Sequence, residues 1–498
     1  MNRFILSFAL AFGLAGVASA QNNSTVEQDG TQNKAVVSQT GANSSTVDQD
    51  AEGAGAFVTQ IGSNASTITQ SDATLNQSTG PNPEDPEATV FQNGTGNVST
   101  VDQSAAAPNS RNIRAFVDQV GDGSTSDLVQ EAAGPGFTGG LTADVDQAGG
   151  SDSEVNQFAQ GSNAKNLFAG VDQDGGSMST VRQSAIGTQA AGLDARVTQD
   201  GGSMSTVDQQ IDADNAGDLR ATVNQAGGAT STVNQSAFGD GSMGLSADVT
   251  QDGASSSTVS QTFDNTLSNT FSATINQVGD GHSSSVDQVD ALPANGGDSD
   301  LTASVTQTGS DNSSDVSQRN RSQSATINQS GTFGTSDLDQ TGGGRNSFEL
   351  DQSGDQNAST ATQRGNGVAT VTQTGFNNAS TITQAGSFRK MATVTQDGDN
   401  GQVFVTQQND ARFETATVEQ QVGADGSVAT IVQNGDMANG NNETRNSASI
   451  IQGPGVFDQA TITQTGSLNE AMTMQSGGGN VATTTQVGVG NTATVTQQ

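Results

Sequence analysis

The sequence predicts an all-β solenoid, a stack of coils that each contain two short strands joined by tight turns. Three observations predict it. A short segment of alternating inward and outward residues, closed by Gln, recurs along the chain. A Gly follows most of these Gln residues, and the small residue inside the segment alternates between Ser and Ala. A period of two indicates strands, and a repeat of this extent indicates stacked similar units.

Each segment reads small, polar, Val/Ile/Leu, polar, Gln, as in Ser24–Gln28 and Ala35–Gln39. We count 38 such segments, most of them 10 to 13 residues apart. Because side chains alternate between the two faces of a strand, one face has the small residue, the Val or Ile and the Gln. An Asn often precedes the Gln by six residues on the same face, and the other face has Thr, Asp, Asn and Ser.

The inward Gln residues are predicted to form ladders along the solenoid axis. A buried amide is costly unless it is hydrogen-bonded, and identical amides at strand spacing can bond to one another. Ladder positions expected from the repeat include Gln147, Gln173, Gln199, Gln225, Gln251, Gln277, Gln373, Gln384 and Gln497.

The alternation of Ser and Ala indicates that the true unit is a pair of strands in two different environments. The series begins at Ser24 and Ala35 and continues to Ala392, with Phe348 as its one exception. The pair has a constant length of 26 residues between Gln147 and Gln277, which predicts that their Gln residues are in register. About 19 such coils over residues 21–498 would form two facing parallel sheets in a cross-β arrangement.

The glycines after the Gln residues are predicted to make the turns, because Gly tolerates the positive φ that tight reversals need. The turn positions expected are Gly30, Gly41, Gly62 and Gly375. Residues 78–87 and 131–140 contain Pro and depart from the repeat. Since Pro cannot donate to a strand ladder, both stretches are predicted to be loop excursions.

Residues 1–20 predict a secretory signal peptide. Arg3 is followed by an apolar stretch, and small residues precede a cleavage site between Ala20 and Gln21. A membrane anchor is the alternative, but the apolar run is short for one and ends at the cleavage site. Without Arg3 the formal charge of −36 becomes −37, and no other stretch of the sequence predicts a membrane span.

Composition excludes several function classes. With 52 acidic and 16 basic residues, a basic surface for nucleic acid is not expected. The absence of Cys rules out disulfides, and a single His argues against a zinc site. That residue, His282, lies in a predicted turn, and no Lys follows a phosphate-binding Gly-rich run. We therefore expect neither an enzyme nor a bound cofactor.

The pattern Asn-x-Ala-x-Val-x-Gln-x-Gly at Asn33–Gly41, and its counterpart ending at Gln497, resembles the curlin repeat. Curlins are the secreted subunits of curli, the amyloid fibres of bacterial biofilms. The resemblance extends over nearly all of the chain after residue 20, although familiar curlins have only about five repeats. It implies inward amide positions at Asn33, Gln39, Asn43, Gln49, Asn64 and Gln70.

The resemblance further implies a homopolymeric, fimbria-like fibre outside a Gram-negative cell, with a role in adhesion and surface attachment. The implied partners are a curli-type outer-membrane secretion pore and a nucleator or minor subunit. The repeat agrees independently, because an uncapped end coil exposes N–H and C=O groups that template another chain, and head-to-tail joining gives a filament.

Two other functions remain open from the sequence. A β-solenoid adhesin or stalk that never polymerises is one. An ice-binding solenoid is the other, since outward pairs such as Thr381 and Thr383 recur. Outward Asp residues, including Asp118, Asp146 and Asp172, are expected to stack and to keep the chain soluble before assembly. Calcium bridging of these columns is the alternative, although no complete calcium loop is present.

Overall fold

The protein is described from a computed structural model. The structure describes residues 21–30, 32–51, 53–72, 86–105, 111–133, 139–160, 164–240, 243–264, 270–290, 300–320, 322–342, 344–409, 413–435 and 445–498. The regular secondary structure within these ranges consists of β-strands. These ranges contain no helix of the length and apolar character that a membrane span requires. The predicted signal peptide and most of the two predicted excursions lie outside the described residues. At their edges, strands already include Glu87, Ala132 and Gly139.

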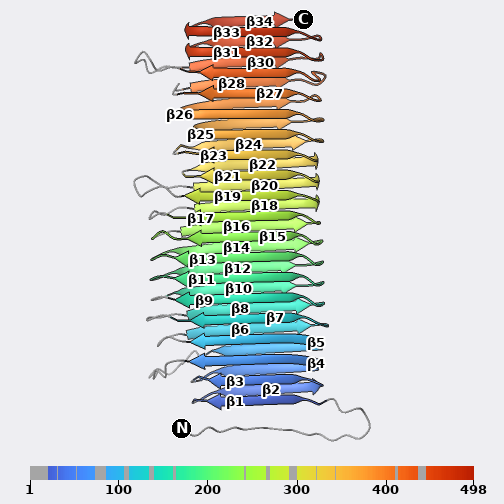
Figure 1. The fold of residues 1–498 in the computed structure, drawn as a ribbon, viewed down its shortest axis with the longest axis vertical. Coiled ribbons are helices and arrows are strands. Elements are labelled where there is room, and N and C mark those ends of the chain that lie inside the picture. Colours follow the sequence, from blue (N-terminus) through green and yellow to red (C-terminus); the bar gives the residue numbers. More distant parts are fainter. Residues whose placement is uncertain are drawn as a thin grey trace. The chain divides into compact units, whose positions relative to one another are not determined.

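The strands belong to two units, each of which is a parallel β-solenoid (Figure 1). Unit 1 contains the described residues up to Gln251 together with 261–264, and unit 2 contains 252–260 and 270–498. The strands of unit 1 are β1 (Asn23–Asp29), β2 (Lys34–Gly41), β3 (Ser44–Asp50), β4 (Gly55–Asp72), β5 (Glu87–Ala105), β6 (Arg111–Val120), β7 (Thr125–Ala132), β8 (Gly139–Ala148), β9 (Asp152–Gln160), β10 (Lys165–Gln173), β11 (Met178–Ile186), β12 (Ala191–Gln199), β13 (Met204–Asp212), β14 (Gly217–Ala226), β15 (Thr230–Ala237) and β16 (Met243–Asp252).

The next strand, β17 (Ser256–Phe263), contributes residues to both units. The other strands of unit 2 are β18 (Thr270–Asp280), β19 (Ser283–Asp290), β20 (Asp300–Ser310), β21 (Ser313–Arg319), β22 (Gln323–Thr332), β23 (Thr335–Thr341), β24 (Asn346–Ser353), β25 (Ala358–Gln373), β26 (Ala379–Gln396), β27 (Gln402–Gln408), β28 (Phe413–Gln420), β29 (Val428–Asn434), β30 (Arg445–Gln452), β31 (Gln459–Ser467), β32 (Glu470–Gln475), β33 (Val481–Val489) and β34 (Thr492–Gln497).

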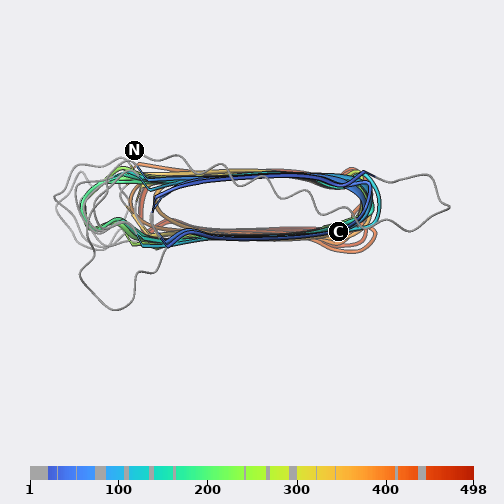
Figure 2. The ribbon, with the colours of Figure 1, turned by 90° about the horizontal axis from the view of Figure 1, so that it is seen from below.

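In unit 1 a strand pairs in parallel with the strand one full coil away. Thus β1 pairs with β3, and β8 pairs with β10, which pairs with β12. The long strands β4 and β5 pass from one layer to the other and contribute a segment to both. We name the two layers by their small inward residue: the serine stack contains β1, β3, β7, β9, β11, β13 and β15, and the alanine stack contains β2, β6, β8, β10, β12, β14 and β16. The end-on view shows these two layers joined by turns (Figure 2). The predicted two-strand coil is confirmed.

Unit 2 repeats this arrangement, with β25 and β26 as the strands that contribute to both stacks. Its serine stack continues through β27, β29, β31 and β33, and its alanine stack through β28, β30, β32 and β34. The Ser series lapses here without a break in pairing. Ser380 is followed in register by Val403, and Val403 by Ala429, so residues of other types are accommodated at this position.

Alternating burial along each strand confirms the inward face. In β13, for example, Ser205, Val207, Gln209 and Ile211 are buried, while the residues between them are more exposed. The Ser hydroxyls of this column, Ser205 included, mostly make no hydrogen bond to any described residue.

A further apolar column was not identified from the sequence. In the middle of unit 1, the alanine stack has a large apolar residue where the curlin pattern has Asn, six residues before each Gln. These side chains are buried, and they are Ile113, Leu141, Leu167, Leu193, Leu219 and Leu245. In these coils the position therefore has no Asn side chain to bond the backbone, and burial of a large apolar side chain stabilises the coil instead.

All four expected turn glycines have positive φ: Gly30 116°, Gly41 111°, Gly62 112° and Gly375 97°. At Gly62 a second constraint applies, because a Cβ atom would collide with the carbonyl oxygen of Gly94 in the next coil. The turn therefore needs Gly both for its backbone conformation and for the close approach of stacked coils.

Candidate functional site: amide ladders and coil ends

The inward Gln residues form hydrogen-bonded ladders with one direction. In each step within a unit, Nε2 of a Gln donates to Oε1 of the Gln one coil closer to the C-terminus, over distances such as 2.6 Å for Gln28–Gln49 and 3.1 Å for Gln147–Gln173. In unit 1 the ladders join Gln28, Gln49, Gln70, Gln103, Gln130, Gln157, Gln183, Gln209, Gln235 and Gln261 in the serine stack, and Gln39, Gln60, Gln92, Gln119, Gln147, Gln173, Gln199, Gln225 and Gln251 in the alanine stack.

Unit 2 has the same ladders with the same direction. They join Gln288, Gln318, Gln340, Gln363, Gln384, Gln407, Gln433, Gln464 and Gln486 in the serine stack, and Gln277, Gln307, Gln329, Gln352, Gln373, Gln396, Gln420, Gln452, Gln475 and Gln497 in the alanine stack.

The second hydrogen of the amide joins the two stacks. Gln183 Nε2 also donates to the backbone carbonyl of Phe168 on the facing layer at 2.7 Å, and Gln235 Nε2 does the same to Arg220 at 2.9 Å. Each such Gln uses both N–H groups and its oxygen, which meets the hydrogen-bonding requirement of a buried amide. The ladder therefore holds successive coils together and also holds the two layers together.

The Asn residues bond differently from the Gln residues. Asn43 Oδ1 accepts from the backbone N–H of Asn64 at 2.9 Å, and Asn43 Nδ2 donates to the carbonyl of Thr40 at 2.9 Å. Asn33 Oδ1 likewise accepts from the backbone of Ala54 at 3.0 Å. The Asn position is therefore mainly a turn cap that bonds to backbone, rather than a second amide-to-amide ladder.

His282 occupies one of these Asn positions, six residues before Gln288. It is 1% exposed, its Nε2 lies 3.0 Å from the Val278 carbonyl, and its Nδ1 accepts from the backbone N–H of Asn312 at 3.3 Å. The imidazole thus serves as a cap for two coils. The sequence predicts His282 in a turn. The structure places it at the end of that turn, directly before β19, where the inward column of this strand begins.

A buried ion pair replaces two successive Asn residues in unit 2. Lys390 Nζ lies 3.0 Å from Glu414 Oε2, with side chains 1% and 0% exposed. The ammonium also donates to the Asn409 carbonyl at 2.9 Å, and the carboxylate accepts from the Gly435 N–H at 2.9 Å. Burial raises the pKa of Glu414 above its ordinary value, and the charge of Lys390 opposes that shift. Sequence reasoning missed the pair, whose only signal was two charged residues at inward positions.

The first and last described coils have the same residue types at the inward Asn and Gln positions. Asn22 and Asn33 precede the first Gln of the two stacks by six residues, and Asn480 and Asn491 precede the last Gln residues in the same way. Among the described residues, no donor reaches Oε1 of Gln28 or Gln39. At the other end of the described chain, Gln497 donates through Nε2 to the Val481 carbonyl at 3.0 Å.

The outward face of the alanine stack in unit 1 has an acidic column. Asp118, Asp146 and Asp172 are paired in register, which confirms the predicted stacking. Burial raises the pKa of Asp118 and Asp146, and the neighbouring carboxylates raise both further. Burial also raises the pKa of Asp144. Within the described part of the chain, no group of three or more His, Cys, Asp or Glu residues could hold a metal ion.

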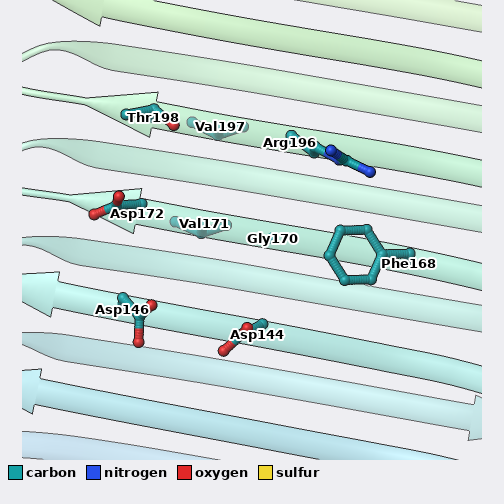
Figure 3. A pocket seen from close by; sticks show the side chains of 9 residues that line it. All are labelled: Asp144, Asp146, Phe168, Gly170, Val171, Asp172, Arg196, Val197 and Thr198. Carbon is teal, nitrogen blue, oxygen red and sulfur yellow. The ribbon is translucent and has the colours of Figure 1, made fainter.

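A hollow of about 230 Å³ lies beside this column, where Gly170 presents no side chain (Figure 3). Asp144, Asp146 and Asp172 line it on one side, with Phe168 and Arg196 on the other. The guanidinium of Arg196 lies 5.6 Å from the centre of the Phe168 ring and pairs with Asp194 at 3.2 Å. Arg196 is therefore engaged by neighbouring side chains of the same sheet surface, through a cation–π contact and an ion pair.

Comparison with known families supports the repeat. A family model described as the curlin associated repeat matches residues 469–498, which contain β32, β33 and β34. The chain contains a curlin repeat. No curated protein matches the chain. The inward residues of this curlin repeat, among them Gln475 and Gln497, belong to the same ladders as those of the preceding coils of unit 2. A curlin repeat within a parallel β-solenoid indicates a structural protein.

Proposed function

We propose that the protein is a secreted subunit of a curli-like extracellular amyloid fibre that serves adhesion in a biofilm matrix. The observation that supports this best is the correspondence of the two coil ends. The ladders run in one direction, so one end of the chain offers amide donors and the other offers amide acceptors. Ends of this kind are complementary, and joining them head to tail gives an open filament.

Specific atoms of the two ends would pair at such a junction. Nε2 of Gln497 would donate to Oε1 of Gln39 in the next copy, and Gln486 would donate to Gln28. By the same rule, Oδ1 of Asn491 would accept from the backbone N–H of Asn33. The exposed N–H and C=O groups of β34 and β2 would complete the sheet. Addition at the junction thus repeats the geometry found between coils inside each unit.

The remaining parts of the proposal follow from the curlin resemblance. Export would use the predicted signal peptide and a curli-type outer-membrane pore, with folding and assembly outside a Gram-negative cell. A nucleator or minor subunit would start the fibre. The acidic outer columns support this order of events, since carboxylates in stacked strands repel and delay pairing until a template is present.

We predict that Gln497→Glu and Gln39→Glu slow or stop fibre growth. Gln497→Glu removes the donor at the junction itself and places two oxygen atoms opposite each other there. Gln39→Glu keeps an acceptor at the junction and removes the donor to Gln60 inside the chain, so Gln497→Glu should have the larger effect on joining. Thioflavin fluorescence of the purified chain after residue 20 measures the rate. Gln160→Glu, at an exposed position of β9, is the matched control. Unchanged kinetics in both ladder variants would contradict the proposal.

We further predict that added salt and mild acid both favour assembly. Salt shortens the screening length from about 10 Å at 0.1 M to about 3 Å at 1 M, which weakens repulsion between acidic columns. The pKa values of Asp118 and Asp146 are raised in the fold, so the folded state binds protons more tightly than the unfolded state. Stability therefore increases as the pH falls through these raised values toward the ordinary 3.8. Urea unfolding and lag times across this pH range test both, and flat responses would show that these charges do not matter.

A further inference from the structure

The outward face of the serine stack in unit 2 lacks acidic side chains from β25 to β33. Its two central columns are almost entirely threonine, paired strand by strand. They are Thr360, Thr381, Phe404, Thr430, Thr461 and Thr483, and Thr362, Thr383, Thr406, Val432, Thr463 and Thr485. We call these twelve residues, with the outward residues on either side, the threonine face.

The flanking columns are uncharged apart from one residue. They contain Ala, Val, Gln, Asn and Thr, and the exception is Arg364 at the edge of the first strand. Several apolar side chains on the face are exposed, with Val481 at 63%, Val487 at 72% and Phe404 at 41%. The face therefore presents methyl groups and hydroxyls with almost no charge.

The same columns are acidic elsewhere. One coil earlier, Asp337 and Asp339 occupy the positions that Thr360 and Thr362 take in β25. Burial raises the pKa of Asp337, and the nearby Asp315 and Asp339 raise it further. In unit 1 the corresponding columns include Glu27, Asp48, Asp102, Asp127, Glu154 and Asp208. In a chain of formal charge −36, a face of this extent without acidic side chains is a local departure from the composition.

We infer that the threonine face packs against the threonine face of a second copy, side by side. Contact between acidic faces would set carboxylates against one another at roughly 1 kcal/mol per pair even in water, and this face avoids that repulsion. Two sheets packed about 10 Å apart can interdigitate threonine methyl groups and valines. A face that meets its own copy forms an isologous contact, which needs no other partner.

The area of the threonine face is consistent with weak association of two single copies and with stronger association of two fibres. Six strands about 4.8 Å apart and seven residues of about 3.3 Å rise give roughly 650 Å² per copy. A standard interface buries about 800 Å² per partner, so one pair should associate reversibly. In a fibre the face would recur in every subunit, and the contacts would add. The inference concerns lateral association and is separate from addition at the coil ends.

The test compares two pairs of substitutions at the same strand position. Thr381→Glu with Thr461→Glu places acids on the threonine face, and Thr393→Glu with Thr417→Glu places them on the alanine stack of the same unit. Sedimentation velocity of the soluble chain measures lateral pairing, and electron microscopy measures fibre width. We expect the first pair to weaken lateral association at least about tenfold and to leave thin, single fibres. The control should behave as the unsubstituted chain, and circular dichroism verifies that both variants fold.

Several outcomes would overturn the inference. They are an unsubstituted chain that neither pairs nor bundles, equal bundling in both variants, or equal loss in both. Thermal hysteresis of the monomer that is lost only in the threonine-face variant would identify ice as the occupant instead. If the unsubstituted chain forms no fibres, the fibre proposal fails, but sedimentation still decides whether two copies pair through this face.

Discussion

Replacing Glu414 with Ala lowers the free energy of unfolding of unit 2 by about 3–5 kcal/mol, because it leaves a buried ammonium group without its counter-charge. Lys390 is 1% exposed, and its one other described hydrogen-bond partner is the carbonyl of Asn409. Water cannot take over the role of the carboxylate without opening the coil. Chemical denaturation followed by circular dichroism measures the loss.

Two controls separate the buried charge from a general effect of substitution. Lys390→Asn combined with Glu414→Asn restores the residue that this column has in Asn446 and should recover most of the stability, since replacing both partners removes the unpaired charge. Glu154→Ala breaks the ion pair between Glu154 and Arg182, in which the Arg182 side chain is 53% exposed and the Glu154 side chain 43% exposed. This loss should cost less than about 1 kcal/mol. If the double variant were as unstable as Glu414→Ala, charge pairing would not be the cause.

The second large effect is expected from Gln183→Leu in the middle of a ladder. The change leaves one amide N–H of Gln157 and the side-chain carbonyl of Gln209 without a buried partner, and it removes the bond from Gln183 to the backbone carbonyl of Phe168. An unsatisfied buried group costs about 1–3 kcal/mol, so two such groups give an expected loss of about 2–6 kcal/mol. Urea unfolding measures this loss, and hydrogen exchange of β9 and β13 should show that protection falls in the neighbouring coils.

Ser179→Ala is the matched control on the same strand. Ser179 is also buried and inward, but its hydroxyl makes no hydrogen bond to a described residue. Its removal should be neutral or slightly stabilising, because no partner is lost. Similar losses in both variants would show that the ladder amides contribute no more than any buried polar side chain.

Much of the fold follows from the sequence because side-chain alternation is a property of the extended backbone itself. The period of two identified the inward Val and Gln of each strand, and the Ser/Ala alternation identified two strands per coil. The constant spacing of 26 residues placed Gln147, Gln173 and Gln199 in register, as the strand pairing confirms. The acidic column at Asp118 and Asp146 followed from the same reasoning.

Other features depend on which residues adjoin along the axis, and this depends on loops of unequal length. Lys390 and Glu414 are 24 residues apart and meet because β26 and β28 pair in a particular register. The threonine face likewise exists only once β25 to β33 are aligned. The bonding of Asn43 to backbone, in contrast to the amide ladder of Gln49, depends on where the shorter side chain reaches relative to the turn.

The strands, their two faces and the amides between them thus follow from local periodicity and from the cost of an unpaired buried amide, and both can be recognised in the sequence. The uniform direction of the ladders, the ion pair within the Asn column and the threonine face became apparent from the folded arrangement. Each of these depends on distances between residues of different coils, and local periodicity does not specify such distances.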